Sequence, residues 1–244
     1  MKVLIVGASG ATGRLLVKEL LNREMNVVAI VRSPEKIHEF LGTHPQLSVV
    51  QASLLELSDE ALISLVEGCD AVASCLGHNL TLKGIYGKPR RLVTDATRRL
   101  CAAIEANTSM PPGKYVLMNT SGNRNRDLKE QISFLQRLVL GLIRLLLPPQ
   151  PDNEKAADYL RTGIGQNHKT IEWVAVRPDS LVNEAHVSDY DLHPSPIRSA
   201  LFNPGKTSRI NVAHFIADLI TDKAKWDAWK GQMPVIYNRS APKP

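Results

Sequence analysis

Apolar residues along the first 120 positions alternate between short continuous runs and runs with helical spacing. Five short runs, rich in β-branched residues, predict buried strands over Lys2–Val6, Val27–Val31, Leu47–Val50, Ala71–Leu76 and Tyr115–Met118. Between them apolar residues recur every three or four positions, as in a helix with one buried face. Continuously apolar strands joined by helices indicate a parallel sheet covered on both faces. We therefore expect an α/β fold, a Rossmann-type doubly wound parallel sheet with strand order 3-2-1-4-5-6.

Local residue types mark where three of these helices begin. Ser33 and Pro34 combine a capping residue with a proline suited to the first helical position. Ser58 begins a helix that Gly68 stops. Pro89 is expected to open a long helix.

The second half is less regular, but it contains further candidate elements. We expect helices over about 127–147, 156–160 and 212–219, a sixth strand over 173–176 and a short terminal strand over 235–237. No repeat and no linker-like stretch is visible. The expectation is one NAD(P)-binding domain over residues 1–244, with a small C-terminal substrate lobe drawn mainly from 122–150 and 179–210.

The segment 132–147 is apolar around most of its circumference and has arginines only at Arg137 and Arg144. A helix of this kind must be buried in the core, or must roof an apolar pocket or form a subunit contact. Binding to a membrane surface is a further alternative, although the basic face is thin. The run is too short and too charged to span a bilayer.

Composition and charge narrow the function classes. The 244 residues include 43% hydrophobic and 22% charged residues, which excludes disordered and low-complexity chains. The net charge of +6 suits an anionic small ligand, and because basic residues occur in nothing longer than pairs, no nucleic-acid partner is expected. We expect a small-molecule substrate, no membrane partner, and a monomer or homodimer.

The cysteines and histidines give no metal-binding pattern. Cys69, Cys75 and Cys101 cannot all pair and lack metal-ligand spacing, which fits a reducing cytoplasm. No targeting segment is apparent at the N-terminus. The seven histidines form no metal-binding cluster, so no metal site is expected.

A glycine-rich segment follows the first strand directly and precedes the first helix. Glycines at this point allow a tight turn, the approach of a pyrophosphate to the backbone, and close packing of helix on strand. The helix N-terminus offers the pyrophosphate unpaired N–H groups. The expected cofactor contacts in this segment are Gly7, Ser9, Gly10, Ala11, Thr12 and Gly13.

The spacing GxxGxxG within GASGATGR resembles the atypical short-chain dehydrogenase/reductase group, specifically its NmrA-like and NAD(P)H-binding branch, which includes flavin and biliverdin reductase-like proteins. The resemblance runs through most of the chain. Its later landmarks are Thr120-Ser121-Gly122, Val176-Arg177-Pro178 and Asn211-Val212-Ala213.

The end of the second strand indicates the cofactor. NAD-binding Rossmann units usually carry an acidic residue about 20 residues after the glycines. This chain has Arg32 and Ser33 there, and a guanidinium with a hydroxyl suits a 2′-phosphate. A solvated surface arginine is the alternative. NADP(H) is favoured over NAD(H).

The resemblance implies further cofactor contacts. Where the family often has Asp at the adenine pocket, this chain has Ser53 followed by Leu54, so a carboxylate contact to adenine is missing. Leu76 and Gly77 close the fourth strand, where the family backbone passes the cofactor ribose. Thr120, Arg177 and Pro178 complete the contacts implied at the ends of the fifth and sixth strands.

The usual proton donor of short-chain reductases is missing, since no tyrosine has a lysine four residues later. This argues against alcohol dehydrogenase or epimerase chemistry that needs such an acid. The resemblance leaves Ser121 as a residue that orients substrate or nicotinamide, with helix capping as the alternative. Lys155 lies near the family's lysine position, one residue out of register, and a solvated lysine is equally consistent.

The sequence therefore favours an NADPH-dependent reductase that transfers hydride to a small electron-poor acceptor such as a flavin or a quinone, because such acceptors need positioning more than an acid. A non-catalytic NADP-sensing regulator of the NmrA type is the alternative. An isomerase of the epimerase or dehydratase kind is a third.

Overall fold

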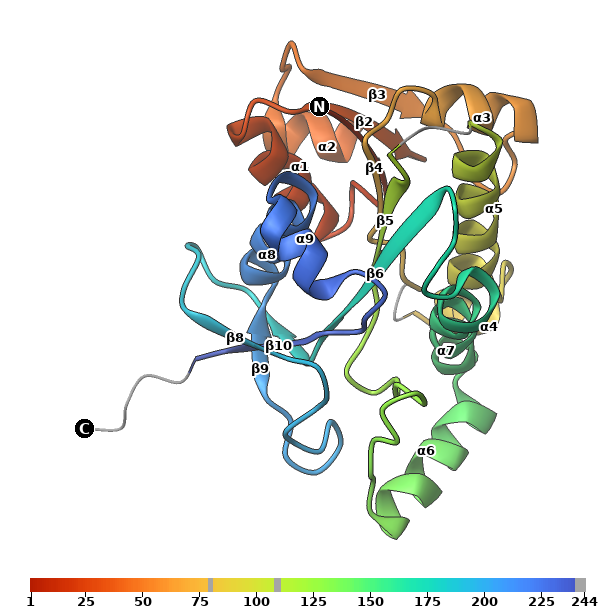
Figure 1. The fold of residues 1–244 in the computed structure, drawn as a ribbon, viewed down its shortest axis with the longest axis vertical. Helices are drawn as coiled ribbons and strands as arrows, with labels where there is room; N and C mark the ends of the chain where they lie inside the picture. The colour runs from red at the N-terminus through yellow and green to blue at the C-terminus, as the bar shows by residue number, and fades with distance from the viewer. Residues whose placement is uncertain (79–80, 108–110, 240–244) are drawn as a thin grey trace.

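The computed structural model describes residues 1–78, 81–107 and 111–239, which form an α/β fold around a mostly parallel sheet (Figure 1). Eight strands make this sheet in the order β3-β2-β1-β4-β5-β6-β10-β8, and β7 pairs with β9 in a small second sheet. The strands are β1 (Lys2–Val6), β2 (Asn26–Val31), β3 (Leu47–Gln51), β4 (Ala71–Ser74), β5 (Gly113–Met118), β6 (Ile171–Pro178), β7 (Ser180–Val182), β8 (Tyr190–His193), β9 (Lys206–Ser208) and β10 (Val235–Asn238).

Helices cover both faces of the large sheet. They are α1 (Gly13–Asn22), α2 (Glu35–Leu41), α3 (Asp59–Val66), α4 (Leu82–Tyr86), α5 (Leu92–Ala106), α6 (Phe134–Leu146), α7 (Pro149–Asp158), the π-helix η1 (Tyr159–Ile164), α8 (Arg209–Thr221) and α9 (Lys223–Trp229).

The sheet order confirms the predicted 3-2-1-4-5-6 arrangement and the added terminal strand, because β10 lies parallel to β6. The antiparallel edge strand β8 and the β7–β9 pair were not predicted. They are three or four residues long. Segments this short, in a region rich in turn-forming residues, carry too few alternating positions to be recognised as strands.

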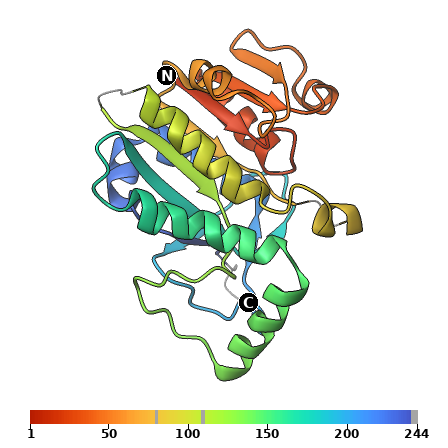
Figure 2. The same ribbon diagram turned by 90° about the vertical axis from the view of Figure 1, so that its right-hand side faces the viewer.

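Alternate residues of each strand enter two separate cores, as expected for a sheet buried on both faces. Val3 and Ile5 of β1 pack in one core with α1, α2, α8 and α9. Leu4 and Val6 pack in the other core with α3, α5 and α7. Figures 1 and 2 show these two helical layers on opposite sides of the sheet.

Several predicted boundaries are wrong. The helix expected from residue 127 begins at Phe134, because Ser133 caps it by accepting a 3.1 Å hydrogen bond from the Gln136 N–H. Pro89 does not open α5, which begins three residues later. The fourth strand ends at Ser74, two residues before Leu76.

The capping predictions had mixed outcomes. Ser58 caps α3, as its hydroxyl accepts from the Ala61 N–H at 3.2 Å. Ser33 does not cap α2, where Pro34 is the capping residue. The predicted helix over 156–160 is the end of α7 and the start of η1.

Helix α6 is not part of either core, so the core alternative for segment 132–147 is wrong. Only Gln136 and Leu140 are buried within it. Figures 1 and 2 both place α6 at one end of the molecule, beyond the layers that sandwich the sheet.

Candidate functional site

The turn between β1 and α1 has no room for side chains at two of its glycines. Gly7 has a φ of +73°, and a Cβ there would lie 2.6 Å from the backbone carbonyl carbon of Cys75. A Cβ on Gly13 would lie 2.1 Å from the Gly7 carbonyl oxygen. The Gly10 N–H donates to that same oxygen at 3.0 Å. The glycines thus hold the start of α1 against the ends of β1 and β4.

A cavity of about 250 Å³ opens beside this turn, at the carboxyl ends of β1, β2, β3 and β4. Eight of the residues predicted to bind cofactor line it: Gly7, Ser9, Gly10, Arg32, Ser53, Leu54, Leu76 and Gly77. Predicted residues Ala11, Thr12 and Gly13 form the turn into α1, and no side chain caps that helix within the described structure. Ser33 does not line the cavity. We call this space the glycine-loop cavity.

Two basic side chains border the glycine-loop cavity. Arg32 and Lys36 both line it, are exposed, and pair with no carboxylate within residues 1–78, 81–107 and 111–239. The sequence analysis did not predict Lys36 as a cofactor contact. It could have been suspected from its position, four residues after Arg32 and in the first turn of α2. Together these groups can hold a phosphate in this part of the cavity.

The wall of the glycine-loop cavity also contains Cys75, directly after β4. Burial raises the pKa of this thiol to about 12. The sulfur is therefore protonated at neutral pH and acts as an apolar wall group rather than a nucleophile.

A second cavity, of about 290 Å³, lies beyond the end of β5. Ser121 lines it, and the backbone N–H of this serine donates to the Pro178 carbonyl at 2.9 Å, which extends the β5–β6 pairing. The opposite walls come from α6 and from the loop before β9, through residues such as Leu140 and Ile197. We call this space the Ser121 cavity.

Two arginines that sequence reasoning missed, Arg124 and Arg198, line the Ser121 cavity. Nε of Arg124 is buried and has no hydrogen-bond partner within the described residues. Because the cavity is also bordered by hydroxyls, it can accept a ligand that carries oxygen acceptors or negative charge. No local motif indicates these arginines, since the folding of two distant segments brings them together.

Thr120 lies between the end of β5 and Ser121. Its hydroxyl accepts a hydrogen bond from the Gly122 N–H at 3.2 Å, so the side chain stabilises the turn. Its contact with a cofactor stays a prediction.

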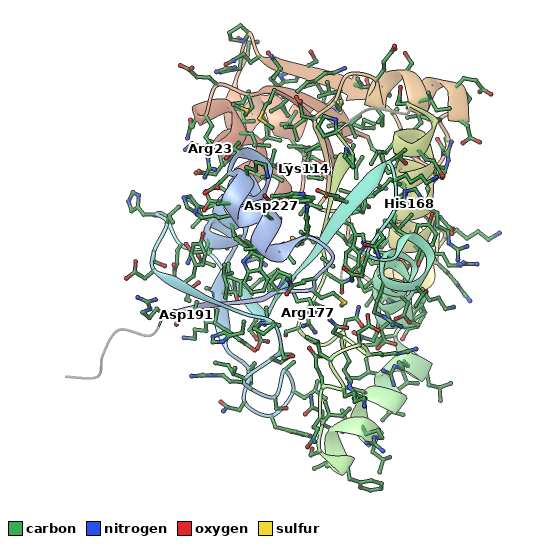
Figure 3. The ribbon with its side chains drawn as sticks, in the orientation of Figure 1. Arg23, Lys114, His168, Arg177, Asp191 and Asp227 are labelled. Carbon is green, nitrogen blue, oxygen red and sulfur yellow. The ribbon has the colours of Figure 1, made fainter. Side chains whose placement is uncertain are left out.

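Arg177 has a structural role whose partners the sequence did not reveal (Figure 3). Its side chain is fully buried, and its guanidinium donates to both carboxylate oxygens of Glu130 and to the carbonyls of Asn123, Met233 and Pro194. The guanidinium therefore joins the segment after β5 to the C-terminal strands. A cofactor contact through the backbone of Arg177 and Pro178 remains a prediction.

Lys155 is not brought to Ser121. It is exposed on α7 and lines neither cavity. The contact between α7 and the end of β5 is instead made by Asn153, whose carbonyl accepts from the Asn119 side chain at 3.0 Å. Lys155 therefore lies outside both cavities.

A buried pair follows Gly77. His78 Nε2 lies 2.8 Å from a carboxylate oxygen of Asp152, and the same carboxylate accepts from the N–H groups of Val93 and Thr94. This arrangement fixes the end of β4 against the starts of α5 and α7. Sequence reasoning missed it because the partners are more than 70 residues apart.

All five tyrosines lie in the described part of the chain, and none lines either cavity. Tyr115, on β5, is fully buried, and burial raises its pKa far above the ordinary value. No phenol is therefore placed to donate a proton from a cavity wall. Among the described residues there is also no cluster of His, Cys, Asp and Glu suited to a metal ion.

Comparison with known sequences identifies a family. The NAD(P)H-binding family matches residues 7–223 of this chain. The chain is 37% identical over 78 residues to dTDP-6-deoxy-L-talose 4-dehydrogenase (NAD(+)) of Aggregatibacter actinomycetemcomitans, a match that covers 32% of this chain and 26% of that protein. It is 32% identical over 84 residues to the chloroplastic divinyl chlorophyllide a 8-vinyl-reductase of Arabidopsis thaliana, covering 31% and 20%. The matched segment thus spans about a quarter or less of these relatives.

Solved structures share the fold over the whole chain. A short-chain dehydrogenase/reductase from Veillonella parvula in complex with NADP has a TM-score of 0.70 at 16% identity, covering 98% of this chain and 95% of that one. ChuY, an anaerobillin reductase from Escherichia coli O157:H7, has a TM-score of 0.67 at 16% identity and covers 100% of both. A proposed NADH-flavin reductase from Streptococcus pneumoniae has a TM-score of 0.65 at 17% identity, covering 98% and 100%.

The glycine turn, the cavity beside it and the match over most of the chain agree with the resemblance seen in the sequence. The chain belongs to the NAD(P)H-binding family.

Proposed function

We propose that the protein is an NADPH-dependent oxidoreductase that transfers a hydride to a small, electron-poor acceptor of the flavin or quinone kind. In this reaction NADPH gives up a hydride and becomes NADP⁺, and the acceptor takes the hydride and then a proton from water. The observation that carries the proposal is the Ser121 cavity, which lies at the carboxyl edge of the sheet and has no tyrosine in its wall. An acceptor that is already electron-poor suits such a site, because positioning rather than acid catalysis lowers its barrier.

The choice of NADPH over NADH rests on Arg32 and Lys36. Both basic groups border the glycine-loop cavity, where a 2′-phosphate on the adenosine ribose would meet them. The Veillonella parvula neighbour was solved with NADP, which is compatible with this choice. The neighbours described as reductases of an anaerobillin and of flavin support the acceptor class by analogy of fold alone.

Within this proposal the residues have distinct roles. Gly7 to Gly13 bind the pyrophosphate, and Ser53 and Leu54 border the adenine. Ser121 orients the nicotinamide or the acceptor, while Arg124 and Arg198 attract oxygen atoms or negative charge on the acceptor. In this proposal segments 122–150 and 179–210 form the substrate lobe. The free cysteines are compatible with the proposed cytoplasmic location.

Turnover tests the proposal. Oxidation of NADPH is followed by its absorbance while riboflavin, FMN or menadione is offered, with wild type, Ser121→Ala and Ser48→Ala compared. Ser48 is an exposed residue of β3 that lines neither cavity, so it is the matched control. We expect Ser121→Ala to lower kcat/KM by about 10- to 100-fold, with little change in NADPH affinity.

The same assay separates the rival functions. A regulator of the NmrA type is favoured by the missing tyrosine as well, and it would bind NADP(H) yet oxidise no NADPH with any acceptor. An isomerase would convert its substrate without net consumption of NADPH. Either result would contradict the proposed reductase.

A further inference from the structure

Helix α6 directs its apolar side chains toward solvent. Phe134 and Leu145 are 77% and 80% exposed. Six large side chains, each more than half exposed, make up what we call the docking face: Phe134, Leu135, Leu138, Leu142, Leu145 and Leu146. They cover an arc of the helix with no charged residue inside it. An ordinary surface helix has the opposite orientation, with its apolar stripe toward the core.

An ion pair with the next helix fixes this orientation. Arg144 pairs with Glu154 of α7 at 2.8 Å. Gln136 and Leu140, one turn apart, are the buried residues and line the Ser121 cavity. Rotation of α6 that turned the docking face inward would break this ion pair and remove Gln136 and Leu140 from the wall of the Ser121 cavity. The outward direction of the docking face is therefore tied to the structure of that cavity.

Exposed basic side chains lie on α6 and in the segment that leads into it. Arg137 is on the helix, at the margin of the docking face, and Lys129 is four residues before the cap. In the described ranges neither of them pairs with a carboxylate. In contrast, the nearby carboxylates of Asp127, Glu130 and Glu154 are each paired with an arginine.

The loop before β9 carries two further exposed apolar residues, Ile197 at 61% and Phe202 at 53% exposed. An exposed apolar surface of this extent with a polar rim is typical of an interaction site. Sequence reasoning judged the basic face of the helix thin because it counted only the arginines of the helix. Lys129, in the segment before the helix, is a further exposed cation.

We propose that the docking face binds an anionic membrane surface, with α6 lying in the plane of the bilayer. An apolar arc of Phe and Leu bordered by Arg and Lys is the chemistry of an interfacial helix, which buries its apolar side among acyl chains while its cations meet anionic headgroups. A second copy of the chain fits less well, because a two-fold contact through the same face would bring together two helices that each carry arginines and no acidic residue. The described helices include none with the length and apolar content needed to cross a membrane, so the contact is with the surface of the bilayer.

Docking in this way would leave the wall of the Ser121 cavity intact, because that wall is formed by the inner side of the helix, which faces away from the bilayer. This inference revises the expectation of no membrane partner. It does not depend on the proposed reductase activity, since its test needs no turnover.

Vesicle sedimentation tests the proposal. The wild-type protein is mixed with vesicles of phosphatidylcholine with one quarter phosphatidylglycerol, or of phosphatidylcholine alone, and the bound fraction is measured in the pellet. We expect binding to the anionic vesicles that is at least about five-fold stronger than to neutral ones and that weakens with added salt. The double variant Leu138→Gln/Leu145→Gln should bind at least about 10-fold more weakly. Arg137→Glu should lose about five-fold or more on the anionic vesicles.

Val187→Gln is the matched control, since it removes an exposed apolar side chain from the loop between β7 and β8. It should bind as wild type does, and all variants should keep the circular dichroism and Tm of the wild type. Wild type that stays in the supernatant with both vesicles overturns the proposal, as does a double variant that still sediments fully. A wild-type dimer in light scattering that the double variant turns into a monomer, with no vesicle binding, would instead make α6 an interface between copies.

Discussion

The glycine turn and the lobe after residue 122 hold their sites in different ways. In the turn, backbone meets backbone: a Cβ on Gly13 would lie 2.1 Å from the Gly7 carbonyl oxygen. In the lobe, side chains carry the structure, and the buried guanidinium of Arg177 holds Glu130 and three carbonyls from separate segments. Where backbone atoms are in contact, a substitution that adds a single Cβ disrupts the site. Where side chains make the contacts, a substitution that removes one charge is enough to weaken the site.

The largest expected effect is therefore at the glycine turn. Gly13→Ala places a methyl group against a backbone oxygen that cannot move without shifting β1, so we expect NADPH affinity to fall by more than about 100-fold, or the fold to be lost. Gly141→Ala is the matched control, because a Cβ there meets nothing within 4 Å and alanine favours a helix. Isothermal titration and thermal unfolding measure both. Unchanged NADPH affinity in Gly13→Ala would show that close backbone contact at Gly13 is not needed for NADPH binding.

The lobe should respond to the loss of a single charge. Glu130→Gln leaves the guanidinium of Arg177 buried and without its counter-charge, which costs about 3–5 kcal/mol and lowers Tm by about 6–20 °C. Asp127→Asn removes half of a more exposed ion pair with Arg161 and should cost about 1 kcal/mol or less. Differential scanning calorimetry compares them. Equal effects for the two variants would contradict the structural role of Arg177.

Substitution of Arg32 tests cofactor binding at the glycine-loop cavity without disturbing the backbone of the turn. If it binds a 2′-phosphate, Arg32→Ala should weaken NADPH binding by about 10- to 150-fold and leave NADH binding nearly unchanged. Arg32→Asp should go further, since it repels the phosphate and offers an acceptor to the ribose hydroxyls. Titration of both cofactors against the three proteins measures this. Equal losses for NADPH and NADH, or no loss for either, would remove the basis for preferring NADPH.

The smallest effect concerns Asp218 of α8, which pairs with Arg23 at the end of α1 and Lys225 of α9 and lines neither cavity. Burial raises the pKa of this carboxyl, but hydrogen bonds from Lys225 and Arg23 and the charge of His214 outweigh it and hold the pKa below the ordinary value. A carboxyl whose pKa is lowered by folding stabilises the protein above its unfolded pKa of about 4, and the gain is lost as pH falls through the lowered value.

Wild type should therefore be more stable than Asp218→Asn by about 1 kcal/mol at pH 7, a difference in Tm of about 2–4 °C that is smaller at pH 3. Thermal unfolding at both pH values measures it. A difference that persists unchanged at low pH would mean that the ion pairs of Asp218 are not its source.

The contrast between the glycine turn and the lobe after residue 122 also explains which residues could be predicted from the sequence. The glycine turn, Arg32, Ser53 and Leu76 were predictable because each lies at the end of a strand within one strand–helix unit, where local pattern fixes position. The contact of Arg177 with Glu130, 47 residues earlier, leaves no local pattern. The same holds for the arginines of the Ser121 cavity, which come from segments far apart in the chain.

Helix α6 shows a second limit. Its apolar periodicity was recognised, but periodicity shows only that a helix has a distinct face and not which way the face points. The polar face of α6 points inward because Arg144 pairs with Glu154 on the next helix. The direction of the apolar face therefore depends on a tertiary contact that the sequence pattern does not contain.

The most direct test of the proposed function is a crystal structure of the protein with NADP⁺. We expect the pyrophosphate over the Gly7–Gly13 turn, the 2′-phosphate within hydrogen-bond distance of Arg32 and Lys36, and the nicotinamide facing the Ser121 cavity. A nicotinamide directed away from Ser121, or a 2′-phosphate that contacts neither basic side chain, would contradict it.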